Sequence, residues 1–478
     1  MNLRTFLATL TMGSMLSPHV SYAQARVIAV GKLPGSDSDH AGQAHKPLEN
    51  GVAGDLLGGF GSGIAHAGGD RFVVVPDRGP NAVPYDSCVD DTASYITRFH
   101  ELRLRLQINN GPGLPFVLTP FLDATKLMSS STPLQYGDGS MCPVPPDPVP
   151  APLPSGAPSL NNRNTFYFTG RSDNFGGGDS LNSAHARLDP ESVRVANDGN
   201  SIFVSDEYGP HVYRFDRNTG VRIGVFPLPS KFAVTYLSSQ GDDEIANNTN
   251  GRITNKGMEG LAITPNGSTL VGIMQSALEQ DGGDKKGQVV RIVTIDIASG
   301  ATTHEYAYQT ETTIKKTTVS DLVAVNDHVL LVDERDGDGL GFPDTTAAEF
   351  KKLYLIDLDG ADDVSSLTGK GNLAPHAVKK YLFLDVLSTL QTALGLTPTE
   401  VPAKLEGIAF GDDVVIGGVT KHTLYVTNDN DFDPSPNNPN QFFVFGFSDD
   451  DLANAKASDN STLGSEKAQF VPQIVQNK

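Results

Sequence analysis

The sequence repeats one pattern of short apolar strands and tight turns, and this repetition constrains the fold more than any other feature. Residues 190–209, PESVRVANDGNSIFVSDEYG, place two apolar runs around an Asn-Asp-Gly-Asn turn, which is typical of a β-hairpin. Two further strands follow over 211–229, and the same order begins again near residues 59, 257, 319 and 404. Repeated sheets of four antiparallel strands predict an all-β fold of the β-propeller type.

The spacing of the copies sets the number of blades. Residues 107–186, between the first and second copies, leave room for either a sixth blade or a long insertion, and the part at about 136–160 is rich in proline. We therefore expect five to six four-stranded blades over 26–447, followed by a C-terminal tail over 448–478. The apolar run at 26–33 has no partner nearby, so we expect this N-terminal strand to complete the last blade and close the ring. The leucines of 381–394 predict one helix.

The N-terminus indicates export. Residues 1–25 combine a positively charged start, an apolar stretch and small residues at cleavage spacing, as in a secretory signal peptide. No later run of 18 apolar residues occurs, so we expect a periplasmic or secreted protein without a membrane span. In an oxidising compartment the two cysteines, Cys88 and Cys142, are expected to form a disulfide; metal-binding or catalytic thiols are the alternative.

The charge of the chain excludes one class of partner. With 36 basic and 56 acidic residues, the formal charge is −20, and a protein that binds nucleic acid needs a basic surface instead. We expect a monomer that acts on a small molecule.

Carboxylates recur at the same places in the repeat. Each copy begins its first strand with an acid, or with Ser62 in the first copy, and ends its second strand with another. Since a hairpin brings its own start and end together, and the first strands of all blades face the channel, these acids should form a ring at one channel mouth. Such an oxygen-rich ring predicts a divalent metal ion, Ca²⁺ by its ligand type. The predicted ligands are Asp77, Glu191, Asp206, Glu259, Asp321, Asp333, Glu406 and Asp429. The alternative is that the acids only pair with arginines or bind backbone N–H groups.

Basic residues lie next to these acids in the sequence. Arg78 and Arg335 directly follow ring acids and could clamp a phosphoryl group, or could form salt bridges to those acids instead. We expect Arg171 and Lys256 to bind substrate. An acid that holds no metal, Glu207 or Glu334, is expected to act as general base.

Several of these motifs together resemble one protein family. The segments DRGP, DPESVRV, SDEYGPHVYRFD, GMEGLAITPNG, LLVDERD and KLEGIAF are similar to the phytase-like family known as "esterase-like activity of phytase", over roughly residues 50–447. The resemblance implies phosphoester hydrolysis by repeated acids, which here are Glu191, Asp206, Glu207, Glu259, Glu334 and Glu406. Ser62 and Asp321 depart from the acid pattern of the family.

The sequence thus predicts an exported, metal-dependent β-propeller hydrolase that acts on phosphate esters. Two alternatives remain: a non-enzymatic propeller that binds Ca²⁺ and a protein or glycan partner, and a lactonase-like or carboxylester hydrolase. Basic residues in the acid ring favour phosphate, because a lactone site does not need them.

Overall fold

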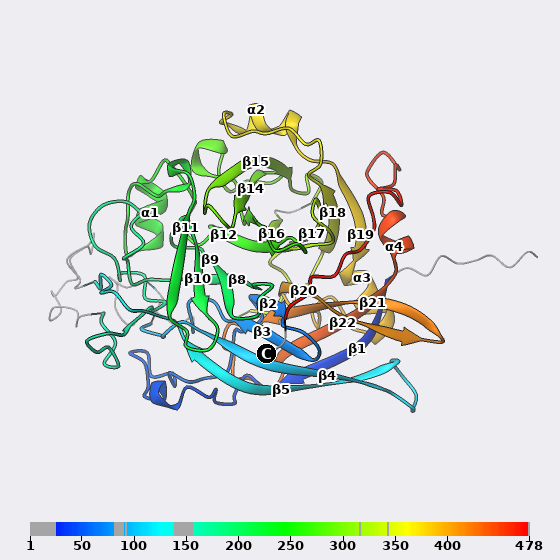
Figure 1. The fold of residues 1–478 in the computed structure, drawn as a ribbon, viewed down its shortest axis with the longest axis horizontal. Helices are drawn as coiled ribbons and strands as arrows, with labels where there is room; N and C mark the ends of the chain where they lie inside the picture. Colours follow the sequence, from blue (N-terminus) through cyan, green and yellow to red (C-terminus); the bar gives the residue numbers. More distant parts are fainter. Residues whose placement is uncertain are drawn as a thin grey trace, which may run out of the picture.

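Five four-stranded antiparallel sheets surround a central channel in the computed structural model, as Figure 1 shows. The structure describes residues 25–80, 90, 93–137, 156–314, 317–341 and 344–476. The predicted all-β propeller is therefore confirmed, with five blades.

Each blade is built from strands that follow one another in the sequence. Blade 1 contains β2 (Gly63–His66), β3 (Arg71–Val75), β4 (Arg98–Ile108) and β5 (Phe116–Leu127). Blade 2 contains β8 (Pro190–Val195), β9 (Ser201–Asp206), β10 (His211–Asp216) and β11 (Arg222–Pro227). Blade 3 contains β12 (Met258–Ile263), β13 (Thr269–Met274), β14 (Val289–Asp296) and β15 (Thr302–Gln309). Blade 4 contains β16 (Thr318–Ala324), β17 (Val329–Arg335), β18 (Lys351–Asp357) and β19 (Lys380–Asp385).

The N-terminal strand closes the ring, as the sequence predicts. Blade 5 consists of β20 (Lys404–Ile416), β21 (Val419–Asp429), β22 (Asn440–Phe447) and, on its outer edge, β1 (Arg26–Leu33). The strands β1 and β22 pair antiparallel from Arg26 opposite Gly446 to Leu33 opposite Asn440. An early strand and a late strand of the chain thus pair in one sheet, and β22 has a neighbouring strand on each side.

The long gap between the first two copies holds an insertion. Its described part forms the small sheet of β6 (Ser129–Ser130) and β7 (Phe166–Tyr167) together with irregular segments. Several predicted features lie outside the described residues: residues 1–24 of the signal peptide predicted over 1–25, most of the proline-rich stretch, Cys88 and Cys142. The disulfide and the processing site therefore stay predictions.

Three α-helices lie in connections between strands of the described residues, and a fourth follows the last strand, β22. They are α1 (Gly241–Asn247), α2 (Lys370–Leu373), α3 (Val386–Leu394) and α4 (Asp449–Ala453). The expected helix over 381–394 begins only at Val386, because the residues before it form β19, the outer strand of blade 4. Among the described residues, no helix combines the length and apolar character needed to cross a bilayer.

The apolar cores lie between neighbouring blades. Val75 of blade 1 packs with Val204 and Phe215 of blade 2, and these side chains are fully buried. On the closing side, Phe72 of blade 1 packs with Phe442 of blade 5. Full burial of one such side chain contributes about 1.5–3 kcal/mol, so each blade depends on both of its neighbours.

One buried ion pair fills the channel and links all five innermost strands. Arg194 of β8 donates two hydrogen bonds to the carboxylate of Asp321 of β16, at 2.9 and 2.8 Å. The guanidinium also donates to the carbonyls of Ile64 (2.7 Å) and Leu322 (2.7 Å). The Asp321 carboxylate accepts from the backbone N–H groups of β12 (3.4 Å) and β20 (3.0 Å). We call Arg194 and Asp321 the channel plug.

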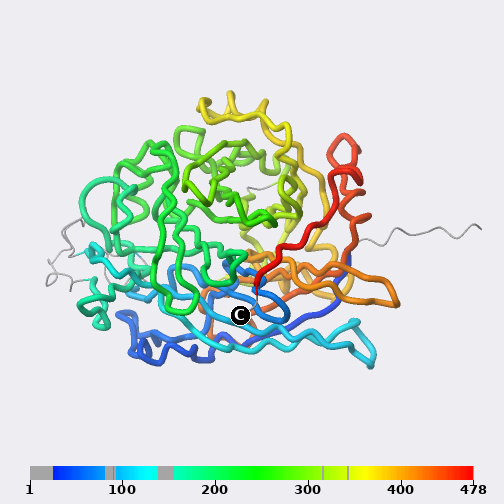
Figure 2. Tube along the Cα trace, viewed as in Figure 1, coloured from blue at the N-terminus to red at the C-terminus, as the bar shows by residue number. Residues whose placement is uncertain are grey.

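The C-terminal segment covers the channel end opposite the starts of the innermost strands. Its Val471 N–H donates to the carbonyl of Val325 in blade 4 (2.8 Å), and its Gln473 side chain donates to the carbonyl of Val195 in blade 2 (2.7 Å). Figure 2 shows this segment, in red, running across towards the middle of the molecule. The plug and this segment leave the other end as the channel mouth.

Candidate active site at the channel mouth

β-bulges present the ring acids at the mouth. In blades 2 to 5 the pairing of the two inner strands shifts after the first residues of the innermost strand. The residue placed in the bulge is Glu191, Glu259, Ser320 and Glu406 in turn. A bulge leaves its extra residue out of the ladder and turns its side chain, which suits residues that face a site.

This register corrects the prediction for blade 4. Alignment of the repeats in the sequence placed Asp321 in the acid ring. In the structure the bulge residue is Ser320, and Asp321 takes the next position, opposite Asp333. At that level the other blades carry Gly63, Ser192, Gly260 and Gly407, and the innermost strands approach closely. Asp321 therefore lies in the channel plug, one step deeper than the mouth.

The second ring position, at the end of the second strand, follows from the same register. It is occupied by Asp77, Glu207, Gln275, Arg335 and Asp429 in blades 1 to 5. Blades 1, 2 and 5 thus supply acids at this level, whereas blade 4 supplies a cation. Negative charge concentrates on one side of the mouth.

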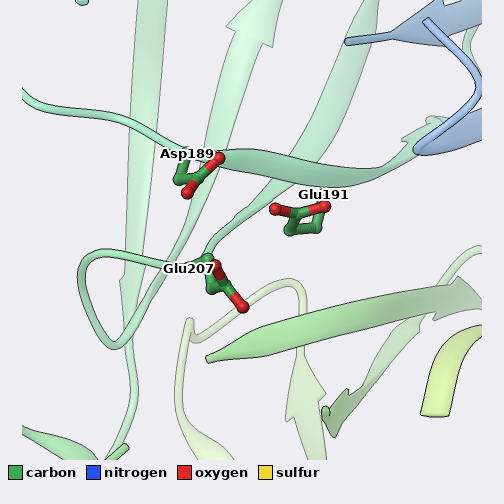
Figure 3. Close-up of side chains that lie close together, drawn as sticks. All are labelled: Asp189, Glu191 and Glu207. Atoms are coloured by element: carbon green, nitrogen blue, oxygen red, sulfur yellow. The ribbon is translucent and has the colours of Figure 1, made fainter. Parts of the chain in front are cut away.

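Three carboxylates come together where β8 begins and β9 ends. One oxygen from each of Asp189, Glu191 and Glu207 lies within 4.8 Å of the others, and all three residues are buried. Figure 3 shows the three side chains around a common space. We call Asp189, Glu191 and Glu207 the mouth cluster. Sequence reasoning identified the two glutamates but missed Asp189, although its place two residues before Glu191 was the available signal.

Burial makes several acids at the mouth hold their protons more strongly. It raises the pKa of Glu207 to about 7, and the neighbouring Asp189 acts in the same direction. Burial and the charges of Glu259, Asp189 and Glu207 raise the pKa of Glu191 well above its usual value. Burial also raises the pKa of Asp429 to about 7 and that of Asp77 well above its usual value. Ionising the whole set in one buried region requires added positive charge.

Protein cations neutralise only some of the mouth acids. The Arg78 backbone N–H and guanidinium donate to Asp189 at 2.8 and 3.1 Å, and Lys404 donates to Asp429 at 2.9 Å. Arg335 forms a salt bridge with Glu406. Arg78 and Arg335 thus pair with carboxylates of the mouth, but not with the acids that directly precede them in the sequence.

The remaining acids of the mouth lack such a cation within the described residues. Glu207 accepts from the backbone N–H of Gly257 (2.9 Å), and Glu259 accepts from the Gln275 amide (2.7 Å). The second oxygen of Glu259 is buried and has no hydrogen-bond partner there. A set of buried carboxylate oxygens with unsatisfied capacity fits a hard divalent cation such as Ca²⁺.

Two predicted residues of the inner strands lie apart from the mouth cluster. Glu334 accepts from Tyr308 (2.7 Å), Thr317 (2.6 Å), Lys380 (2.7 Å) and a backbone N–H at 2.5 Å, so donors already surround its carboxylate. Strand alternation directs Asp333 and Arg335 to the side opposite Glu334. One carboxylate oxygen of Asp333 is buried without a partner, at the level of the plug.

The other predicted residues have local partners. Asp206 accepts from the backbone N–H groups of Asp189 (3.1 Å) and Tyr208 (3.0 Å), so it shapes the loop that carries the mouth cluster. Arg171 is buried and donates to Asp173 at 2.5 and 2.9 Å. Lys256 lies 3.7 Å from Asp284.

The fold and the site together define a five-bladed β-propeller with a buried acidic mouth. The chain belongs to the phytase-like family described as "esterase-like activity of phytase", whose sequence pattern it matches over residues 55–432. The resemblance drawn from the motifs is thereby confirmed.

One curated relative is an "uncharacterized secreted protein" of Arthroderma benhamiae, 32% identical over 289 residues. The match covers 53% of this chain and 52% of the relative, so the chain spans about half the length of that protein.

Solved structures give only distant similarity. A putative 6-phosphogluconolactonase from Bacteroides uniformis is 11% identical over 82% of this chain and 90% of its own, with a TM-score of 0.29. Hydrazine synthase of Kuenenia stuttgartiensis is 15% identical over 51% of this chain and 65% of its own, with a TM-score of 0.24.

Proposed function

We propose that this protein is an exported hydrolase of phosphate esters that depends on a divalent metal ion, Ca²⁺ by its ligand type. The observation that carries the proposal is the mouth cluster, in which three buried carboxylates converge within 4.8 Å. Membership of the phytase-like family and the secreted relative support the reaction class and the export.

Asp189, Glu191 and Glu207 are the residues that would hold the metal ion. A bound divalent ion supplies positive charge for phosphate oxygens and lowers the pKa of water. Arg78 donates to Asp189 and therefore orients one member of the set.

We assign the general base to Glu259. Its free oxygen is buried at the mouth, and its other oxygen is fixed by Gln275. Burial, with the charges of Glu207 and Glu406 next, raises its pKa well above the usual value, so this carboxylate has a raised affinity for a proton. Of the two candidates from the sequence, Glu207 belongs to the mouth cluster, and Glu334 already accepts four hydrogen bonds.

The test is a substrate screen on metal-depleted protein reloaded with Ca²⁺, Mg²⁺, Mn²⁺ or Zn²⁺. Substrates are p-nitrophenyl phosphate, bis(p-nitrophenyl) phosphate, phytate, p-nitrophenyl acetate and a simple lactone. We expect metal-dependent phosphate release that falls by roughly 10²–10⁴-fold in Glu259→Gln, as for loss of a general base. The control is Glu466→Gln, which alters an exposed acid of the tail.

Each other result selects a different function. Turnover of the acetate ester or lactone without phosphate release would replace the proposal with the carboxylester or lactone alternative. Metal binding without turnover of any substrate would leave the non-enzymatic Ca²⁺-binding propeller.

A further inference from the structure

A second polar cavity of about 260 Å³ lies beside the mouth cluster. Its lining comes from the connection between β3 and β4, the insertion before β8, the β9–β10 turn and the segment between β11 and β12. The charged residues of the lining are three arginines and three acids: Arg78, Arg187, Arg252, Asp90, Asp242 and Glu244. The hydroxyl groups of Tyr208 and Ser239 also line it. Because Arg78 also donates to Asp189, the cavity adjoins the mouth cluster directly.

Arg187 is the unusual member of this cavity. Its side chain is 3% exposed, and its guanidinium carbon lies 4.5 Å from the ring centre of Phe175 and 4.8 Å from that of Tyr208. Nη1 donates to the carbonyl of Ser172 at 3.1 Å. Nη2 is buried and has no hydrogen-bond partner among the described residues. Two aromatic rings thus hold the Arg187 guanidinium in place, and its Nη2 has no acceptor in the described part of the chain.

Ser239 supplies a second unsatisfied donor in the same cavity. The residue is 1% exposed, and its carbonyl accepts from the Ser172 hydroxyl at 2.8 Å. Its own hydroxyl is buried without a partner in the described part of the chain. Buried polar groups normally have a partner, so two unsatisfied donors in one cavity indicate that an acceptor is missing.

The pattern of ion pairs in the cavity favours an anion as this acceptor. Arg252 is neutralised by Glu244, to which it donates at 2.7 Å, and Arg78 is paired with Asp189. No carboxylate in the described residues forms a salt bridge with Arg187. Burial lowers the pKa of Arg187, and the nearby Arg252 lowers it further, although Glu244 acts in the opposite direction. Arg187 is therefore the arginine of this cavity that has no salt bridge in the described part of the chain, although Asp90, Asp242 and Glu244 also line the cavity.

We propose that this cavity binds a phosphate group through Arg187 and Ser239, next to the mouth cluster. A tetrahedral oxyanion has enough acceptor oxygens for both unsatisfied donors and for the neighbouring arginines. The volume suits one phosphate group with a few attached atoms. The inference rests on the proposed function only in making that phosphate part of the substrate; binding of the anion itself needs no turnover.

The test measures binding of inorganic phosphate to the full mature chain after metal has been removed on a chelating resin, by calorimetry and by thermal shift. Arg187→Met keeps the apolar stem between the two rings but removes the donors, and Ser239→Ala removes a hydroxyl that has no partner to lose. We expect saturable binding that weakens at least tenfold in Arg187→Met and several-fold in Ser239→Ala. The control is Arg163→Gln, an exposed arginine of the insertion, with unchanged affinity.

Phosphate that does not bind the parent, or that binds all variants equally, would overturn the inference. Tighter binding of acetate than of phosphate would overturn the assignment to phosphate. If Arg187→Met does not fold, Ser239→Ala carries the comparison alone. Since no metal or turnover is involved, a failed hydrolysis screen leaves this result intact, and hydrolysis without binding at this cavity would refute the inference but not the proposed function.

Discussion

The channel plug and the mouth cluster both place carboxylates on innermost strands, yet their surroundings differ. Asp321 in the plug receives two bonds from Arg194 and further bonds from a serine hydroxyl and two backbone N–H groups. At the mouth, the charges that most affect Glu191 are those of neighbouring acids. Both residues are almost fully buried, so burial does not distinguish them. The number of hydrogen-bond donors around each carboxylate distinguishes them. A carboxylate that is surrounded by donors holds the fold together, and one that lacks donors is available to bind a cation.

The first prediction concerns removal of the negative charge of Asp321 from the channel plug. In Asp321→Asn, Arg194 becomes a buried charge without its partner, and loss of one member of such a pair costs about 3–5 kcal/mol. We expect that loss in the free energy of unfolding, measured by urea denaturation. This is the largest effect among our predictions.

The same variant should leave the mouth unchanged. We expect Asp321→Asn to keep the parent's gain in melting temperature on addition of Ca²⁺. A double variant with Arg194→Met, which also removes the unpaired cation, should recover part of the lost stability. An Asp321→Asn protein as stable as the parent would show that the pair does not hold the five strands.

The second prediction addresses the mouth. Glu191→Gln removes one charge from a repulsive group, so the metal-free protein should be as stable as the parent or slightly more stable. The parent should gain about 2.7 kcal/mol at a hundredfold excess of Ca²⁺ over its dissociation constant, and the variant should lose most of that gain. Melting curves with chelator and with Ca²⁺ measure both quantities.

Glu334→Gln is the matched control, because it changes a carboxylate of similar burial that has four donors. It should lower the stability of the metal-free protein by about 1–3 kcal/mol and keep the Ca²⁺ response. If Glu191→Gln and Glu334→Gln behaved alike, the distinction between acids with and without hydrogen-bond donors would be wrong.

The fold could be predicted from the sequence because each blade has a recognisable local sequence pattern. Alternating apolar residues and Asp-Gly turns specify hairpins, and the unpaired strand at 26–33 had one place to go, beside β22. The position of the acids at one mouth followed from hairpin geometry alone. Neither inference needed contacts between residues distant in sequence.

The details of the site depend on features that spacing does not reveal. A bulge adds one residue to a strand, so counting along blade 4 placed Asp321 where Ser320 lies. Asp189, Arg187 and Arg252 come from irregular segments whose lengths differ between blades, and a repeat comparison passes over them. The partners that saturate Glu334 come from strands β15 and β19 and from the segment before β16, which only the folded sheet brings together.

The last prediction concerns protons and is the smallest effect. Burial holds the pKa of Glu207 and of Asp429 at about 7, far above the values of these groups in an unfolded chain. Between about pH 4 and 7 these two groups bind more protons in the folded than in the unfolded state, so their contribution to the stability of the metal-free protein falls as the pH rises. Buried His100 and His211, whose pKa values burial lowers to about 4, act in the opposite direction over the same range.

The pH dependence of the free energy of unfolding would therefore combine these contributions. The number of protons released on Ca²⁺ binding reports on the mouth carboxylates alone. A carboxyl group must lose its proton to bind a metal ion, so binding at pH 6 should release on the order of one proton and binding at pH 8 much less. Calorimetry in buffers of different ionisation enthalpy measures that number. Asp321→Asn should release as many protons as the parent, because the plug takes no part, and Glu191→Gln should release fewer. A proton count near zero at both pH 6 and pH 8 would mean that the mouth carboxyls are already ionised before the metal binds.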